Sequence, residues 1–183
     1  QLSELHQEFQ RTTLFVTHDQ VEAMTLGQRI CVMNEGEIMQ IGTPSEIYNQ
    51  PAHRFVAEFF GTPSINVLEG EISDIEGEYC FEHDEQKIIF SSSKTIPEGP
   101  VLLGLRPDCL HVQIEKSADS WEANLKRIEN MGDIRVLHFQ IHDQKFTLKS
   151  IRNDFITGQS YCIKPEWKEA HWFDSIIGIR ISG

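Results

Sequence analysis

The spacing of apolar residues changes near residue 62 of the 183-residue chain. In residues 1–62, apolar positions three and four apart alternate with short continuous apolar runs, which predicts helices mixed with strands. The elements expected are a helix over 1–10, a strand over 13–16, a helix over 19–26, strands over 30–33 and 38–41, a short helix beginning at residue 44, and a helix over 52–60.

Start and stop signals support these elements. Asp19 followed by Glu22, and Thr43 followed by Glu46, have the spacing of capping boxes. Gly36 in Asn34-Glu35-Gly36 suits the left-handed position of a hairpin turn. Phe55, Phe59 and Phe60 are expected to bury one side of the helix that ends at Gly61.

After Pro63 the apolar segments become short, alternating and bounded by turn residues, which is typical of a small barrel or sandwich. The boundary between the two patterns falls at 61–64. The strands expected are 69–75, 79–83, 87–90, 101–106, 110–114, 121–129, 135–141, 145–150, 160–164 and 176–181.

Composition narrows the class of protein without naming a function. The net charge of −12 argues against a nucleic-acid partner or a polybasic membrane anchor. The four cysteines are widely spaced and form no CxxC pair, so we expect buried reduced thiols rather than disulfides or a zinc site. No signal peptide or membrane-length apolar run is visible, and the first residue is Gln1, so the chain looks cut or processed.

A histidine stands where the predicted strand 13–16 gives way to a helix. Ligands of α/β proteins meet side chains at the carboxyl ends of strands, so His18 could donate a hydrogen bond to a phosphate oxygen while Asp19 caps the helix. A structural role in the strand–helix turn is the alternative reading of the same position.

The string TLFVTHDQVEAMTLGQRICVMNEGEIMQIGTPSEIYNQPAHRFVAEFFG resembles the H-loop and following segment of ATP-binding-cassette (ABC) ATPases. It is most similar to importer subunits of the maltose, glycerol-phosphate, polyamine and iron type. LLGLRPDCLHV resembles the LRP stretch of that family's accessory domain, the TOBE domain, a barrel related to OB folds. The resemblance implies a mainly β chain: residues 63–183 as a TOBE/OB-like β-barrel, preceded by residues 1–62 as an incomplete α/β part of a P-loop ATPase domain.

The resemblance also implies a role for His18 as the catalytic and ATP-contacting residue that meets the γ-phosphate and the attacking water. The chain has no GxxxxGK[ST] loop, no LSGGQ-like signature and no aliphatic run ending in Asp-Glu. ATP and magnesium are therefore expected in the intact parent subunit, and this segment alone is expected to bind no cofactor and hydrolyse no ATP. The strand 13–16 would lack sheet neighbours, so we expect the N-terminal third to be disordered, packed in a new way or exchanged between chains.

The partners implied are a second ATPase subunit in a homodimer and transmembrane permease subunits, at the cytoplasmic face of the membrane. The barrel would then serve dimer contact and regulation. A barrel that senses a small anion or sugar as effector is the alternative. A free-standing protein that binds oligosaccharide or nucleic acid is a third reading, and the negative charge disfavours nucleic acid. The transported solute does not follow from this segment.

Three other groups of residues attract attention. His138 and His142 would share a strand face roughly 13 Å apart, which is too far to chelate one metal ion. Arg106 and Asp108 flank Pro107 and either form a subunit contact or pair to fix a turn. Trp121, Trp167 and Trp172 either form a sugar-binding platform or pack in the core.

Overall fold

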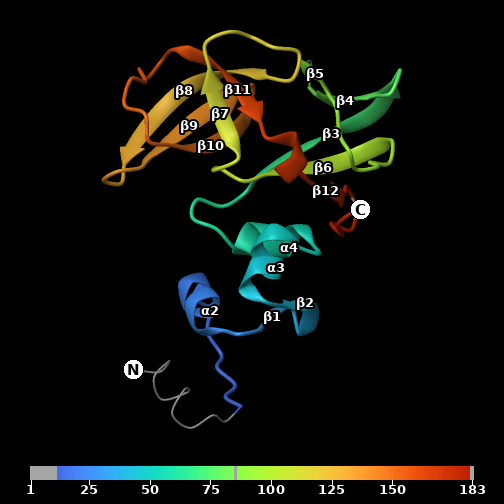
Figure 1. Ribbon diagram of the computed structural model, residues 1–183, viewed down its shortest axis with the longest axis vertical. Coiled ribbons are helices and arrows are strands. Elements are labelled where there is room, and N and C mark those ends of the chain that lie inside the picture. The colour runs from blue at the N-terminus through green and yellow to red at the C-terminus, as the bar shows by residue number, and fades with distance from the viewer. Residues whose placement is uncertain (1–11, 85, 182–183) are drawn as a thin grey trace. The chain divides into compact units, whose positions relative to one another are not determined.

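The computed structural model describes residues 12–84 and 86–181, and it confirms the predicted mainly β fold (Figure 1). The chain divides into two compact units, residues 1–61 and 62–183, which we call unit 1 and unit 2. The helix expected over 1–10 lies outside the described residues. No helix in the described part of the chain is long and apolar enough to cross a membrane.

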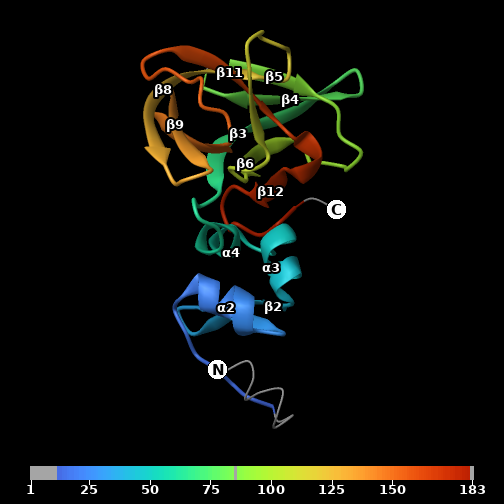
Figure 2. The same cartoon turned by 60° about the vertical axis from the view of Figure 1, so that its left-hand side comes forward.

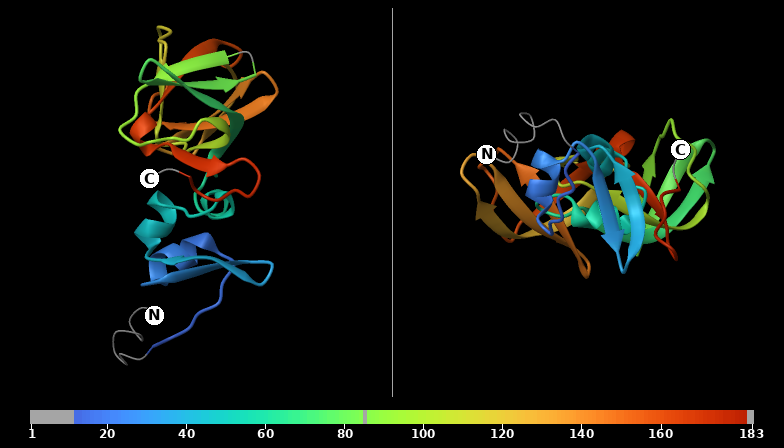
Figure 3. Two further views of the ribbon diagram at one scale, coloured as in Figure 1. Left: turned by 90° about the vertical axis from the view of Figure 1, so that its right-hand side faces the viewer. Right: turned by 90° about the horizontal axis from the view of Figure 1, so that it is seen from below.

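The described part of unit 1, residues 12–61, contains three short helices and one hairpin around a small core. Its elements are α2 (Gln20–Leu26), β1 (Ile30–Asn34), β2 (Glu37–Gly42), α3 (Pro44–Asn49) and α4 (Arg54–Phe59). Ala23 and Met24 of α2 pack against a buried cluster formed by Ile30, Val32, Ile47, Val56 and Phe60. Within unit 1, the helix α2 lies beside the β1–β2 hairpin (Figure 3, left). Phe59 was expected in this core, but its side chain is 41% exposed, because only one side of so short a helix can face the cluster.

The predicted hairpin turn and one of the two predicted capping boxes are present. Glu35 and Gly36 form a two-residue loop with φ of 50° and 86°, the backbone of a type I′ turn. At α3, Thr43 Oγ1 accepts from the Glu46 amide and the Glu46 carboxylate accepts from the Thr43 amide, which is a complete box. The box expected at Asp19 and Glu22 is wrong in its second half, because the Glu22 carboxylate binds Thr17 instead.

The strand expected over 13–16 is absent, and residues 12–17 have irregular backbone. The Leu14 and Val16 side chains are 90% and 87% exposed. The residues are good strand formers, but a strand exists only through main-chain hydrogen bonds to a neighbour, and no described strand lies next to this segment in a ladder.

Unit 2 consists of two five-stranded antiparallel sheets (Figures 1 and 2). In the first sheet the strand order is β12-β6-β3-β4-β5, and in the second it is β10-β9-β8-β11-β7. The strands are β3 (Asn66–Ile75), β4 (Glu78–His83), β5 (Gln86–Phe90), β6 (Gly99–Leu105), β7 (Leu110–Gln113), β8 (Trp121–Asn130), β9 (Arg135–Ile141), β10 (Gln144–Ser150), β11 (Ser160–Pro165) and β12 (His171–Asp174), with the 3-10 turn η1 (Trp167–Glu169) before the last.

One aromatic cluster fills the space between these sheets. The Phe90 ring lies parallel to Trp167, with centroids 3.9 Å apart, and to Trp172, with centroids 5.7 Å apart. Trp121 and Trp172 are 0% and 1% exposed. The core-packing interpretation of the tryptophans is therefore confirmed, and the faces of these two buried rings cannot serve as a sugar platform.

The last strand was placed too late in the sequence. It is His171–Asp174, which pairs with β6, and residues 176–181 form a short return that touches it through the Phe173–Arg180 bridge. The chain reverses because Asp174 Oδ1 accepts from the Ile176 and Ile177 amides at 2.8 Å each. The Ile176 side chain is 89% exposed, so the apolar run there does not mark a buried strand.

Candidate functional site

His18, the one catalytic residue predicted from sequence, lies in the bend that leads into α2 and is exposed. Asp19 is the N-cap of α2, and its Oδ1 accepts from the Val21 amide at 2.7 Å and the Glu22 amide at 3.2 Å. This cap fixes the start of the helix immediately after the histidine. The predicted cap at Asp19 is therefore present, and the role of His18 stays a prediction.

A second set of hydrogen bonds holds the backbone on both sides of His18. Thr17 Oγ1 accepts from the Asp19 amide at 3.0 Å, so the Thr17 side chain reaches across His18. The same hydroxyl donates to Glu22 Oε2 at 2.6 Å. Among the described residues, we find no hydrogen bond to the His18 ring itself.

The chemistry available at this point is that of one histidine. An exposed imidazole can donate a single hydrogen bond to an acceptor such as a phosphate oxygen. In the described ranges, no group of three or more His, Cys, Asp or Glu residues is arranged to hold a metal ion.

His138 and His142 do not share a strand face. His138 lies on β9, and its Nε2 is 3.3 Å from Glu129 Oε1 on β8. His142 lies in the β9–β10 turn with φ of 49°, and its Nδ1 is 3.6 Å from Asp84 Oδ2. The expectation of a shared face is wrong because β9 ends at Ile141, one residue earlier than that reading required.

The turn expected around Pro107 is present, since the Cys109 amide donates to the Arg106 carbonyl at 3.0 Å. Arg106 is only 2% exposed, whereas Asp108 is exposed. A pairing of the Arg106 and Asp108 side chains stays a prediction.

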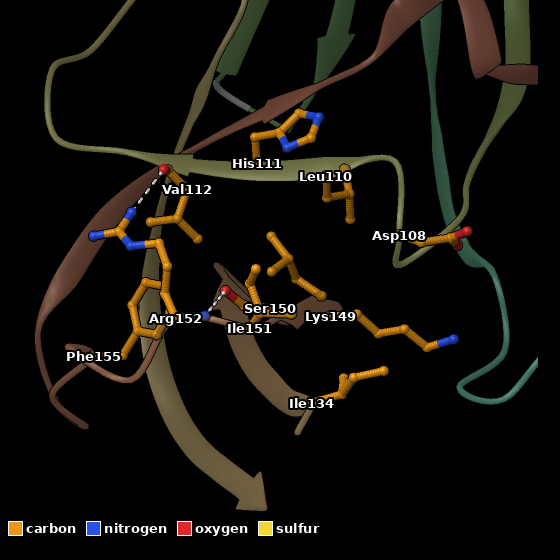
Figure 4. A pocket seen from close by; sticks show the side chains of 11 residues that line it. Asp108, Leu110, His111, Val112, Ile134, Lys149, Ser150, Ile151, Arg152 and Phe155 are labelled. Atoms are coloured by element: carbon orange, nitrogen blue, oxygen red, sulfur yellow. Dashed lines mark hydrogen bonds between the residues drawn. The ribbon is translucent and has the colours of Figure 1, made fainter. Parts of the chain in front are cut away.

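A cavity in unit 2 was not predicted from the sequence. It has a volume of about 500 Å³ and opens between β7, the end of β10 and the segment after it (Figure 4). Leu110 and Val112 point into this cavity, whereas the His111 ring points to the other side of β7 (Figure 4). We call it the β7–β10 groove; it is lined by Asp108, Leu110, His111, Val112, Ile134, Leu148, Lys149, Ser150, Ile151, Arg152 and Phe155.

The polar end of the groove is organised around Arg152. Its Nε and Nη2 donate to the two carboxylate oxygens of Asp154 at 3.0 and 2.6 Å, and its Nη1 donates to the Val112 carbonyl at 3.4 Å. The guanidinium also lies 5.0 Å from the centroid of the Phe155 ring. The hydrogen bond from Arg152 lowers the pKa of Asp154 and the same bond raises the pKa of Arg152. The guanidinium is therefore held in one orientation beside an apolar floor.

The sequence gives no local signal for this groove. Its residues come from 108–112, from 134 and from 148–155, and their spacing matches no binding motif. Only the curvature of the sheet brings them together.

No model of a known protein family matches the chain. Individual proteins do match it over nearly its whole length. The chain is 37% identical over 191 residues to the sn-glycerol-3-phosphate import ATP-binding protein UgpC of Yersinia pestis, covering 99% of this chain and 50% of that protein. It is 32% identical over 201 residues to the oligosaccharides import ATP-binding protein MsmX of Bacillus subtilis, covering 99% and 52%.

A third relative is the uncharacterized ABC transporter ATP-binding protein YurJ of Bacillus subtilis, which is 34% identical over 188 residues, covering 96% of this chain and 51% of that protein. The chain thus spans about half the length of the curated relatives it matches, and the matched region is their C-terminal half. The resemblance to ABC importer subunits is confirmed, because nearly the whole chain is similar to the C-terminal half of ABC importer ATP-binding proteins.

Proposed function

We propose that this chain is the C-terminal part of the ATP-hydrolysing subunit of an ABC solute importer. The observation that carries the proposal is the exposed His18 ring on a turn held by Thr17, Asp19 and Glu22, within a segment that resembles the H-loop. In this function His18 donates a hydrogen bond to the γ-phosphate and orients the attacking water. Phosphoryl transfer depends mostly on positioning and charge stabilisation, so a single fixed donor has a large effect.

ATP and magnesium belong to the intact subunit in this proposal, and residues outside this chain bind most of the nucleotide. The segment by itself hydrolyses no ATP, because one histidine cannot replace a cradle of main-chain donors together with a magnesium ion. Isothermal titration of this chain with Mg-ATP should detect no binding. Micromolar affinity would contradict the proposal.

Unit 2 is the accessory domain in this proposal, with roles in dimer contact and regulation. The subunit works as a homodimer beneath permease subunits at the cytoplasmic face of the membrane. Contact through the accessory domains keeps the two nucleotide sites at a high effective concentration while they open and close. The names of the relatives, which include import proteins for glycerol phosphate and for oligosaccharides, support an importer and leave the solute open.

The test is the His18→Ala substitution in the full-length subunit reconstituted with its permease. Loss of one preorganised donor should raise the barrier by about 3 kcal/mol, or more than 100-fold in ATP turnover. His142→Ala is a matched control, because His142 is exposed in the β9–β10 turn of unit 2 and does not line the groove. Turnover of His18→Ala equal to that of the control would reject the role of His18.

The β7–β10 groove favours a second candidate function, the sensing of a small anion or sugar. Its apolar floor, the fixed guanidinium of Arg152 and the carboxylate of Asp108 are the mixture of surfaces that small-molecule sites use. Titration of this chain with sugar phosphates, sugars and simple organic acids, followed by NMR, tests it. Saturable shifts confined to the groove residues and lost in Arg152→Ala support sensing, and shifts unchanged by that substitution exclude this site.

A further inference from the structure

We propose that Thr17 and Glu22 are positioning residues for His18. The inference rests on the proposed role of His18 in ATP hydrolysis and adds two residues to it. The Thr17 hydroxyl accepts from the Asp19 amide and donates to the Glu22 carboxylate, so one side chain joins the residues on both sides of the histidine. The backbone that carries the exposed His18 side chain is thereby enclosed in a short ring of hydrogen bonds.

Helix capping alone does not require this arrangement. In a capping box the acidic residue three positions after the N-cap would bind the N-cap amide. In this protein the Asp19 amide is taken by Thr17 Oγ1 and the Glu22 carboxylate binds the same hydroxyl. Asp19 Oδ1 already accepts from both the Val21 and Glu22 amides. The Thr17–Glu22 pair therefore leaves the cap to Asp19 and restrains the backbone that carries the imidazole.

The restraint falls on the two torsions that aim the ring. A hydrogen bond from the Asp19 amide to Thr17 Oγ1 closes a turn that contains φ and ψ of His18, and so it limits both torsions. Glu22 in turn limits the rotamer of Thr17, because its Oε2 accepts from the Thr17 hydroxyl with the two oxygens 2.6 Å apart. Glu22 lies in the first turn of α2, so the Thr17–Glu22 bond restrains the position of His18 relative to that helix.

Such a device affects rate more than stability. Thr17 is half-buried and Glu22 is exposed, so water replaces either hydrogen-bond partner when the other is removed. The transition state, by contrast, needs its donor within a fraction of an ångström, and a misplacement of about 1 Å can cost about 100-fold in rate. Removing either partner should therefore lower turnover while the helix and its cap persist.

The experiment compares removal and conservative variants in the full-length subunit reconstituted with its permease. Thr17→Val and Glu22→Ala should each lower kcat by about tenfold with KM for ATP unchanged. Thr17→Ser keeps the hydroxyl and Glu22→Gln keeps an acceptor oxygen, so both should recover most of the lost turnover. The double variant Thr17→Val/Glu22→Ala should be no slower than either single variant, because both substitutions remove the same hydrogen bond between Thr17 and Glu22.

A spectroscopic readout in this chain separates positioning from folding. In two-dimensional NMR, Thr17→Val and Glu22→Ala should each shift the Asp19 amide, and the Val21 amide capped by Asp19 should move much less. Loss of dispersion throughout α2 would indicate a structural role and overturn the inference.

The kinetic outcomes distinguish this inference from the proposed function. If His18→Ala abolishes hydrolysis while Thr17→Val stays within about twofold of wild type, the positioning role fails and the function stands. If His18→Ala retains turnover, the proposed function itself fails. Multiplying effects in the double variant would also overturn the inference, because they would show that the two residues act separately.

Discussion

The side-chain amide of Asn66 pairs with the main chain of Thr147 as a neighbouring strand would. Asn66 Nδ2 donates to the Thr147 carbonyl at 2.8 Å, and Asn66 Oδ1 accepts from the Thr147 amide at 2.6 Å. Nδ2 also donates to the Leu105 carbonyl at 3.0 Å. Asn66 lies on β3 of one sheet and Thr147 on the edge strand β10 of the other. One buried amide thus joins the two sheets of unit 2.

A second hydrogen bond joins the edge strand β10 to the segment before β7, which is the opposite edge strand of the same sheet. The Lys149 amide donates to the Pro107 carbonyl at 2.9 Å, just before β7 begins. Together these bonds satisfy alternate main-chain groups along β10 and draw the edge strands of that sheet together. This arrangement agrees with the expected OB-like domain, and it leaves the β7–β10 groove where the two strands separate again.

Asn66→Ala should destabilise unit 2 strongly. The substitution removes three hydrogen bonds and leaves main-chain groups of Thr147 and Leu105 without these partners, which costs about 2–4 kcal/mol in the free energy of unfolding. Urea denaturation followed by tryptophan fluorescence measures it, because all three tryptophans lie in unit 2. Asn153→Ala, at an exposed position, is the control. Equal midpoints for the two variants would show that the amide contributes nothing.

The buried ring of His171 should make unit 2 less stable in mild acid. Burial, with further contributions from Arg106, Arg180 and Lys94, lowers the pKa of His171 from 6.5 to about 3. The folded chain therefore keeps the ring neutral at a pH where the unfolded chain protonates it. Because the unfolded state binds more protons below pH 6.5, stability is fully present above that value and falls as the pH drops toward 3.

The slope is measurable between pH 7 and 5, above the range where carboxylates titrate. The contribution of His171 approaches about 1.4 kcal/mol per pH unit at the lower end of that window. His171→Gln removes the titrating group, so its free energy of unfolding should vary less with pH than that of the wild type. Parallel pH profiles for the two proteins would mean that the ring is protonated in the folded state.

Local signals account for the parts of the fold that sequence predicted well. Thr43-Pro44-Ser45-Glu46 contains a whole capping box within four residues, and Gly36 marks a turn that only a few residues form easily. The strands β8 and β9 follow from an alternation of buried and more exposed positions over most of their length. In these cases the physical cause and the sequence pattern lie in the same short segment.

Most of the wrong predictions concern segments whose structure depends on residues that are distant in the sequence. Residues 13–16 have strand composition and no ladder partner, and residues 176–181 have an apolar run that the fold leaves largely exposed. The pairing of Thr17 with Glu22 replaced an expected capping box, because a hydroxyl two residues upstream competed for the same groups. The groove depends on strands some 40 residues apart in sequence, so no pattern in one segment could predict it.

His18 could be singled out from the sequence because it directly precedes a helix start and lies in a segment that resembles the H-loop. The restraint around it could not be predicted, since Thr17 and Glu22 are common residue types at a helix start. Their roles follow only from which atoms pair.

The cysteines should differ in reactivity toward alkylating reagents. Cys31 is exposed on β1, whereas Cys109 is half-buried, and burial together with the nearby Asp108 carboxylate raises the pKa of Cys109 to about 11. Because the thiolate is the reactive form, iodoacetamide at pH 8 should label Cys31 well before Cys109. Peptide mass spectrometry over time measures the order, and Cys31→Ser confirms the assignment. Faster labelling at Cys109 would mean that its surroundings open in solution.

A stabilising substitution is available in the β3–β4 hairpin. Glu76 and Gly77 connect the paired residues Ile75 and Glu78 with φ of 57° and 92°, so a glutamate occupies a left-handed position that asparagine adopts more readily. Glu76→Asn should raise the free energy of unfolding of unit 2 by roughly 0.5–1 kcal/mol. Glu98→Asn makes the same charge change at an exposed position without positive φ, and it should leave the urea midpoint unchanged. A gain of equal size in both variants would assign the effect to charge, and the turn explanation would then be wrong.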